Sequence, residues 1–245
     1  MAASQARTKR WTRLEYERLI DLGAFGPEER LELIAGQLVV REPQGRPHST
    51  GIRLVAGALR AAFGPDWNVE AQLPVALDEE SEPEPDVAVV AGGPRDYLAS
   101  HPTCPALVVE IALTSLALDR GEKASIYARA GVADYWLVNL VDNLLEVYRD
   151  PQADPAAPYD WRYGSTTTLR RGDVVAPLAL PHWRIPVSKR AGLVMLLAFL
   201  GLNSRWLDAE SHDVERLVQG VASGKVSKAE SAVFVQRHLR TRPRD

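Results

Sequence analysis

The stretch that decides the fold is residues 105–139, PALVVEIALTSLALDRGEKASIYARAGVADYWLVN. Its first part is a continuous apolar run with Glu110 inside it, which is typical of a strand covered on both faces. The middle part predicts a helix that ends at Gly131, because glycine readily adopts the backbone conformation that stops a helix. The last part, ADYWLVN, predicts a second strand. A strand, a helix and a strand are therefore expected in succession, with one acid in the first strand.

The segments before this stretch predict two helices and a hairpin. Residues 11–22 place apolar side chains at near-helical spacing, with Thr12 as the N-cap. Residues 30–40 alternate apolar and polar side chains on both sides of Ala35–Gly36, which indicates a β-hairpin with a two-residue turn. A second helix is expected from about 49 to 63.

Strand patterns fill most of the remaining chain up to residue 187. Strands are predicted at 67–77, 85–92 and 143–149, and a further hairpin at 160–175 is followed by a loop. From 188 onward the pattern is helical, with three candidate helices. We therefore expect an α/β fold with a helical C-terminal appendage, divided into residues 11–187 and 188–245.

Composition excludes several classes of protein. The chain has 245 residues, of which 46% are hydrophobic and 25% charged, as in ordinary globular domains. Its one cysteine, Cys104, cannot form an internal disulfide or a multi-cysteine metal site, which suits a reducing compartment. No secretory signal is expected at the start, and the longest apolar stretch, 193–202, has about half the length of a membrane-spanning helix. We expect a cytoplasmic protein that does not enter a membrane.

Charge is spread unevenly along a chain whose net charge is −3. Residues 188–245 hold 10 Lys and Arg against 6 Asp and Glu, whereas residues 1–187 hold 19 against 26. The basic tail is either a solvated helical face or a contact for nucleic acid.

Three acids lie where apolar neighbours make them costly. Glu32 lies in LELIAG, Asp86 in PEPDVAVV and Glu110 in LVVEIAL, and each carboxylate loses water as its strand packs. One such acid is most often a hydrogen-bonded structural residue, and Asp86 could be a strand-edge acid. Three acids with Lys123 on the following helix form a recurring set, in which two carboxylates hold Mg²⁺ and an ammonium stabilises charge at phosphorus or orients water.

These motifs resemble the bacterial Uma2-like restriction-endonuclease family of the PD-(D/E)XK nuclease superfamily. The resemblance rests on LELIAGQLVV, His48, PEPDVAVV, LVVEIA and, above all, DRGEKASIYARAGVADYWLVN at 119–139. It covers roughly residues 11–187. It implies a restriction-endonuclease-like mixed β-sheet flanked by helices, and an endonuclease that hydrolyses phosphodiester bonds of nucleic acid.

The resemblance also implies a site. Asp86 and Glu110 would be the metal ligands, for Mg²⁺ or in its place Mn²⁺, with Glu32 as an outer acid and Lys123 as the basic group. The implied substrate is DNA, although no residue pattern separates DNA from RNA, and a homodimer is expected. A catalytically idle module that binds nucleic acid or assembles with a partner remains the alternative.

Two further residues are open to two interpretations. His48 either touches phosphate or the leaving oxygen, or is a hydrogen-bonded structural residue. Asp119 either forms an ion pair with Lys123 in the site or belongs to a surface i,i+4 pair.

Two features depart from the superfamily's pattern. The usual lysine lies two residues after the second acid, where this chain has Ala112. The resemblance implies a lysine displaced onto the following helix, which Lys123 fits. The segment after Glu110 also lacks the Ser-Pro-Ser-Thr-like turn of relatives.

Overall fold

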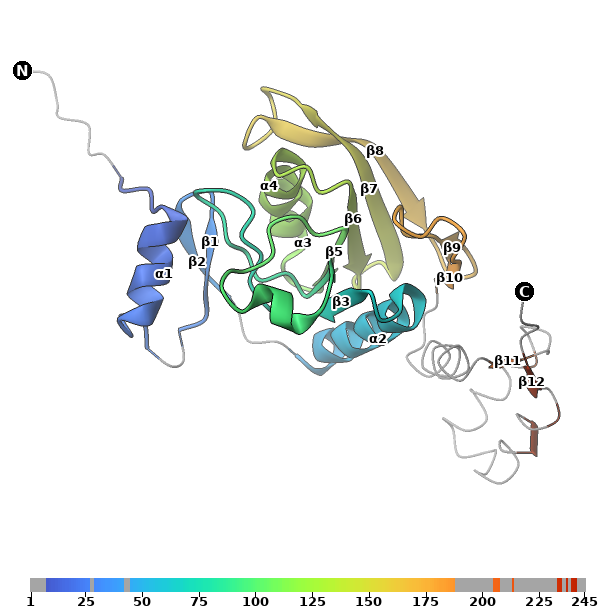
Figure 1. Ribbon diagram of the computed structural model, residues 1–245. Helices are drawn as coiled ribbons and strands as arrows, with labels where there is room; N and C mark the ends of the chain where they lie inside the picture. Colours follow the sequence, from blue (N-terminus) through green and yellow to red (C-terminus); the bar gives the residue numbers. More distant parts are fainter. Residues whose placement is uncertain are drawn as a thin grey trace, which may run out of the picture.

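The centre of the molecule is a six-stranded sheet (Figure 1). The computed structural model describes residues 8–26, 29–41, 45–187, 205–207, 213, 233–234, 237 and 239–241. In spatial order the strands are β3 (Trp67–Glu70), β4 (Val87–Ala91), β5 (Leu107–Ala112), β6 (Asp134–Asn139), β7 (Leu144–Ala153) and β8 (Trp161–Leu169). β5 and β6 pair in parallel, and the other neighbours pair antiparallel. The predicted mixed sheet of an α/β fold is confirmed.

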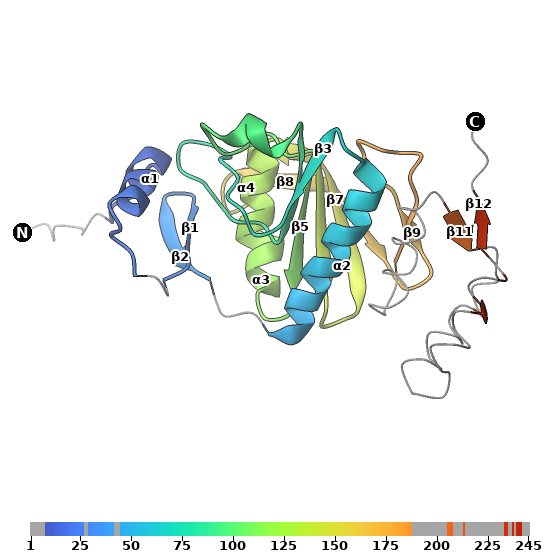
Figure 2. The same cartoon turned by 60° about the horizontal axis from the view of Figure 1, so that its bottom comes forward.

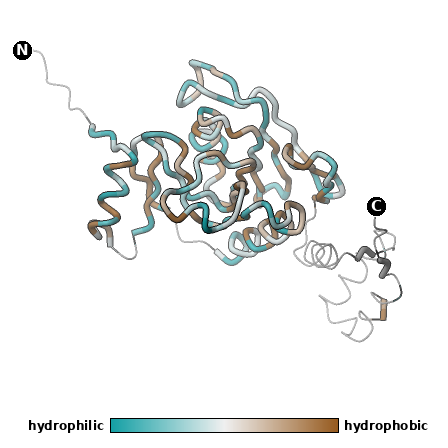
Figure 3. Tube along the Cα trace, in the orientation of Figure 1, coloured by the Kyte–Doolittle hydropathy of each residue, from teal (hydrophilic) through white to brown (hydrophobic). Residues whose placement is uncertain are grey.

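Strand β5 is covered on both faces, as its apolar sequence predicts. Helices α2 (Arg46–Phe63) and α4 (Ala124–Arg129) lie on either side of it in both views (Figures 1 and 2). Val109 and Ile111 belong to the apolar cluster that includes α2, whereas Val108 and Ala112 belong to the cluster that includes α4. Side chains alternate along a strand, so Glu110 shares the α4 face of the sheet. Hydrophobic residues run along these central strands in Figure 3.

The crossover from β5 to β6 contains a π-helical turn. It runs through α3 (Leu116–Leu118), η2 (Asp119–Lys123) and α4, and a 3₁₀ turn, η1 (Pro94–Tyr97), lies between β4 and β5. The predicted helix is confirmed in place and in its end, because Gly131 adopts a φ of 76°. The sequence did not predict the π-helical turn, a feature that is rare and often found at functional sites.

The N-terminal hairpin forms as predicted and lies beside the segment that precedes β4. Helix α1 (Arg13–Asp21) comes first, and the hairpin strands are β1 (Leu31–Ile34) and β2 (Gln37–Val40). Thr12 caps α1, and Ala35 and Gly36 adopt φ values of 47° and 77°, as a tight hairpin turn requires. Leu33 pairs with Glu82 in an isolated antiparallel bridge. This bridge brings β1 to the edge where β4 begins.

Four features of the predicted elements are wrong. The strand expected at 67–77 ends at 70, and α2 begins at 46 instead of 49. The hairpin predicted within 160–175 does not form, because β8 pairs with a β7 that continues to Ala153. β9 (Val174–Val175) pairs with β10 (Ile185–Pro186), which the sequence indicated as loop. Local pattern identifies strands, but the partner of a strand depends on which edge is open.

Most of residues 188–245 lie outside the described residues. Within the helices expected at 189–202, 208–223 and 227–240, the structure describes helical backbone at 213, 233–234 and 237. Two described pieces, β11 (Arg205–Leu207) and β12 (Leu239–Thr241), pair antiparallel, so the helix expected over 227–240 does not include its last two residues. The division into 11–187 and 188–245 stays a prediction. No helix in the described part of the chain is long and apolar enough to cross a membrane.

Packing of α2 against the sheet predicts the effect of truncating a side chain. Leu59 is 1% exposed within the α2 cluster, so Leu59→Ala is expected to lower the free energy of unfolding by about 2–5 kcal/mol. Leu14 on α1 is 76% exposed, and Leu14→Ala is expected to change it by about 0.5 kcal/mol or less. Urea denaturation of both variants checks this, and equal losses would contradict the packing.

Candidate active site

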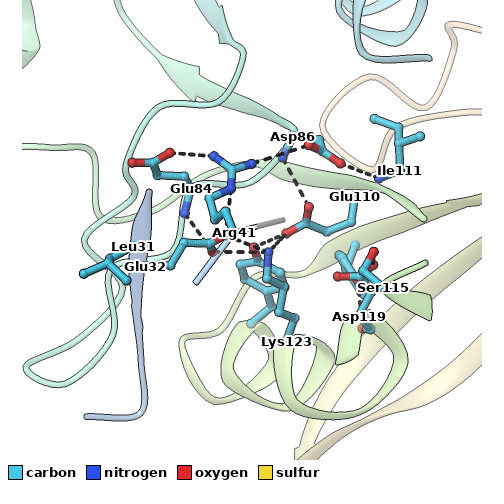
Figure 4. A network of polar contacts seen from close by, with 12 residues as sticks. Leu31, Glu32, Arg41, Glu84, Asp86, Glu110, Ile111, Ser115, Asp119 and Lys123 are labelled. Atoms are coloured by element: carbon cyan, nitrogen blue, oxygen red, sulfur yellow. Dashed lines mark hydrogen bonds and ion pairs between the residues drawn. The ribbon is translucent and has the colours of Figure 1, made fainter. Parts of the chain in front are cut away.

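Four acids and two cations from separate parts of the chain form one cluster, in which Glu84 alone among the acids is partly exposed (Figure 4). The acids are Glu32 on β1, Glu84 and Asp86 just before β4, and Glu110 on β5, and the cations are Arg41 after β2 and Lys123 at the end of η2. None of Glu32, Asp86, Glu110 and Lys123 is more than 5% exposed. The structure thus brings together all four residues that the sequence assigned to the chemistry.

Lys123 reaches two of these acids from the crossover helix. Its ammonium lies 3.0 Å from Glu110 Oε1 and 3.2 Å from Glu32 Oε2. Tyr127, four residues further on, donates its hydroxyl hydrogen to the same Glu110 oxygen at 2.7 Å. The strand position where the superfamily's lysine usually lies holds the buried Ala112. Lys123, on the following helix, nevertheless reaches Glu110.

The carboxylates around Lys123 favour the charged form of its side chain. Burial lowers the pKa of Lys123, but the carboxylates of Glu110 and Glu32 outweigh burial and leave the pKa above its ordinary value. Burial raises the pKa of Glu110 to about 8, against the lowering effect of Lys123. At neutral pH Lys123 can therefore act as a cation and not as a general base.

Asp86 and Glu110 lie next to each other. The Asp86 N–H donates to Glu110 Oε2 at 3.2 Å, and the Ile111 N–H donates to Asp86 Oδ2 at 2.8 Å. His48, in the first turn of α2, places Nε2 2.9 Å from the same Asp86 oxygen. The other oxygen, Oδ1, faces Arg41 Nη2 at 3.7 Å, too far for a hydrogen bond. Asp86 Oδ1 thus accepts no hydrogen bond within the described part of the chain.

The Asp86 and Glu110 carboxylates offer oxygen ligands of the kind that hard divalent cations take. No group of three or more His, Cys, Asp and Glu side chains within the described ranges is arranged to hold a metal ion. Mg²⁺ however takes only one or two carboxylates from many proteins and completes its shell with water and phosphate. With every carboxyl ionised, four acids against Arg41 and Lys123 leave an excess of two negative charges in the cluster. One divalent cation balances that excess.

The sequence left the roles of His48 and Asp119 open, and the structure bears on each differently. His48 contacts Asp86, while its Nδ1 is buried without a hydrogen-bond partner in the described part of the chain. Asp119 is 2% exposed, so the surface-pair interpretation is wrong. Its Oδ2 accepts a hydrogen bond from Ser115 Oγ at 2.5 Å, and no ion pair joins it to Lys123 among the described residues. The π-helical turn explains this, because i,i+4 residues do not align there as in an α-helix.

Sequence reasoning missed three members of the cluster. Glu84 lies two residues before Asp86 in PEPD, within an acidic segment that the local pattern does not distinguish from a solvated loop. Tyr127 lies at helical spacing from Lys123, which is the one signal that could have identified it. Arg41 follows an apolar strand, and nothing in the local pattern shows that its side chain turns inward.

An apolar groove elsewhere is distinct from this cluster. It has a volume of about 410 Å³ and lies between α2 and the β6–β7 end of the sheet, with Leu54, Trp136 and Val187 among its lining residues. None of the six residues proposed for the site lines it.

The family model of Uma2, described as "Putative restriction endonuclease", matches residues 14–188. The chain belongs to the Uma2 family. Among solved structures, a protein described as a putative nuclease belonging to DUF820, from Anabaena variabilis ATCC 29413, superimposes with a TM-score of 0.54 at 17% identity. The match covers 72% of this chain and 94% of that chain, and at this identity it shows the fold. No curated protein matches the chain.

The raised pKa of Glu110 predicts that metal binding depends on pH. A metal ion that binds the carboxylate competes with a proton below about pH 8, so affinity for Mg²⁺ is expected to rise with pH and level off above that value. Calorimetric Mg²⁺ titration from about pH 6 to about pH 9 checks this through proton release.

Glu82 provides the control, because burial raises its pKa to about 7 while its charged neighbours are Glu17, Arg13 and Glu84. Glu82→Gln is expected to leave the pH dependence of metal binding unchanged. A wild-type affinity that stays constant across the range would contradict the role of Glu110 as a ligand.

Proposed function

We propose that this Uma2-family protein is a Mg²⁺-dependent endonuclease that hydrolyses phosphodiester bonds of DNA, with Mn²⁺ as a substitute ion. The observation that carries the proposal is the pairing of Asp86 and Glu110, linked at 3.2 Å, with the Lys123 ammonium 3.0 Å from Glu110. Two adjoining carboxylates with a fixed cation beside them suit the binding of a metal ion and a phosphate.

Each residue has a physical task in this proposal. Asp86 and Glu110 would hold the ion, which when bound polarises the phosphoryl oxygen and lowers the pKa of the attacking water. Lys123, kept charged by its two carboxylates, stabilises the negative charge that develops on the phosphoryl oxygens. Glu32 contacts both Lys123 and Arg41, so it orients the two cations.

The choice of DNA, the cellular location and the oligomeric state belong to the same proposal. The family's description as restriction endonucleases supports DNA as the substrate. Cys104 is an exposed free thiol, which suits a reducing cytoplasm. A homodimer would supply two active sites, one for each strand of a duplex.

Removal of either proposed ligand tests the metal site. Asp86→Asn and Glu110→Gln keep the shape of each side chain, and each is expected to lower Mg²⁺-dependent cleavage at least about 100-fold. Asp154→Asn, which breaks a surface ion pair with Arg162, is the control and is expected to cleave normally. Cleavage assays on DNA and RNA of the same sequence measure both activity and substrate class.

Two results would reject the proposal. Cleavage by either variant at the wild-type rate would show that the assignment of ligands is wrong. A wild-type chain that binds nucleic acid but cuts neither DNA nor RNA would instead be a binding module that keeps the fold.

Lys123 makes a separate prediction. Lys123→Met is expected to lose cleavage about 100-fold or more. Because Lys123 also lowers the pKa of Glu110, affinity for Mg²⁺ is compared at a pH at which Glu110 is ionised in both proteins, where it is expected to be kept or improved because a cation beside the ion is removed. Circular dichroism establishes that the variant is folded, and calorimetric Mg²⁺ titration measures affinity. A large loss of Mg²⁺ affinity in the folded variant would show that Lys123 only supports the ligands.

A further inference from the structure

Arg41 is a second buried cation that the proposed roles of Asp86, Glu110 and Lys123 leave unused. It follows β2 directly, and its side chain is 9% exposed and turned into the acid cluster (Figure 4). Burial lowers the pKa of its guanidinium, but Glu32 and Glu84 outweigh burial and raise it. Arg41 is therefore charged at neutral pH.

Two acids hold the Arg41 guanidinium through Nε and Nη1 and leave Nη2 aside. Nε lies 3.0 Å from Glu32 Oε1, and Nη1 donates to Glu84 Oε2 at 2.5 Å. The two acids are themselves connected, because the Glu84 N–H donates to Glu32 Oε2 at 3.2 Å. Glu32 and Glu84 thus fix the plane of the guanidinium without help from either proposed metal ligand.

The remaining nitrogen faces the proposed metal site. Nη2 lies 3.7 Å from Asp86 Oδ1, close enough for electrostatic attraction but too far for a hydrogen bond. Within the described residues, its hydrogens have no acceptor at hydrogen-bond distance. Oδ1 is also the oxygen of Asp86 that accepts no hydrogen bond among the described residues. The free donors of Arg41 therefore lie where a phosphate bound beside the metal ligands would be.

The two acids that hold Arg41 would not have to change partners when the site is loaded. Glu32 and Glu84 are not proposed ligands, so the guanidinium can stay in place while Asp86 and Glu110 are occupied. A guanidinium is planar, permanently charged and weakly hydrated, and it forms strong charge-assisted hydrogen bonds with phosphate oxygens.

We propose that Arg41 binds the substrate's phosphodiester group, donating from Nη2 to a non-bridging phosphate oxygen, and that Glu32 and Glu84 position its guanidinium. This inference rests on the proposed function, because the metal ligands define where the phosphate lies. It assigns substrate binding to an arginine outside the three acids and the lysine. Arg41 would then contribute one of the phosphate contacts that make nucleic-acid affinity depend on salt.

The experiment is a DNA-binding titration across salt on the full chain, without metal and with Ca²⁺ in place of Mg²⁺. Arg41→Gln is expected to weaken binding about tenfold or more and to lower the slope of log affinity against log salt by about one. Arg41→Lys keeps the positive charge but loses the planar guanidinium with its several donors, so it is expected to restore the slope and only part of the affinity.

The matched control removes another arginine that is paired with one acid. Arg162→Gln on β8, at the far edge of the sheet from β4, breaks the ion pair with Asp154 and is expected to change neither affinity nor slope. Calorimetric titration with Ca²⁺ alone shows whether Arg41→Gln still binds metal, once its melting temperature is found to match that of the wild type. Metal affinity that is kept or improved supports the proposal.

The outcomes separate this inference from the proposed function. If Arg41→Gln binds DNA with wild-type affinity and slope, or loses its metal affinity, Arg41 is a structural counter-ion and the inference fails, whether or not the wild type cuts DNA. A wild type that does not cut, but whose salt slope depends on Arg41, overturns the nuclease proposal and leaves the phosphate contact. A wild type that binds neither DNA nor RNA overturns both.

Discussion

The contact between Glu110 and Lys123 is the interaction on which the rest of the structure depends. Glu110 lies inside a strand covered on both faces, so its carboxylate has lost water and needs donors from the protein. The crossover helix supplies the Lys123 ammonium and the Tyr127 hydroxyl, and the chain before β4 supplies the Asp86 N–H. One buried acid thereby connects three segments that are distant in the sequence.

Compensation of charge extends this connection to the N-terminal hairpin. Glu32 contacts Lys123 on one side and Arg41 on the other, and Arg41 in turn contacts Glu84. A buried charge without its partner is strongly destabilising, so the hairpin, the segment before β4 and the crossover helix are held in one arrangement. With every carboxyl ionised, the four acids of this cluster outnumber its two cations, and this excess is the physical basis on which we propose that a divalent ion binds.

Much of the fold could be predicted because its signals are local. The hairpin turn at Ala35–Gly36, the Thr12 cap and the helix stop at Gly131 each follow from one or two residues. The pairing of β8 with a long β7, and of β9 with β10, could not be predicted, because strands with similar alternation compete for the same edges. The π-helical turn at Asp119–Lys123 also gives no local signal, and it changes which side chains share a face.

The candidate site divides in the same way. The sequence by itself determined that Glu32, Asp86 and Glu110 lie in apolar strand-like surroundings and that Lys123 follows on a helix, because burial of a charge is visible in its neighbours. Only the tertiary structure decided that these four converge and that Arg41, Glu84 and Tyr127 join them. The physical reason is that a long side chain at the end of a strand or loop can turn either to solvent or to the interior. Its direction is set by charges that lie far away in the sequence, as Glu32 and Glu84 set that of Arg41.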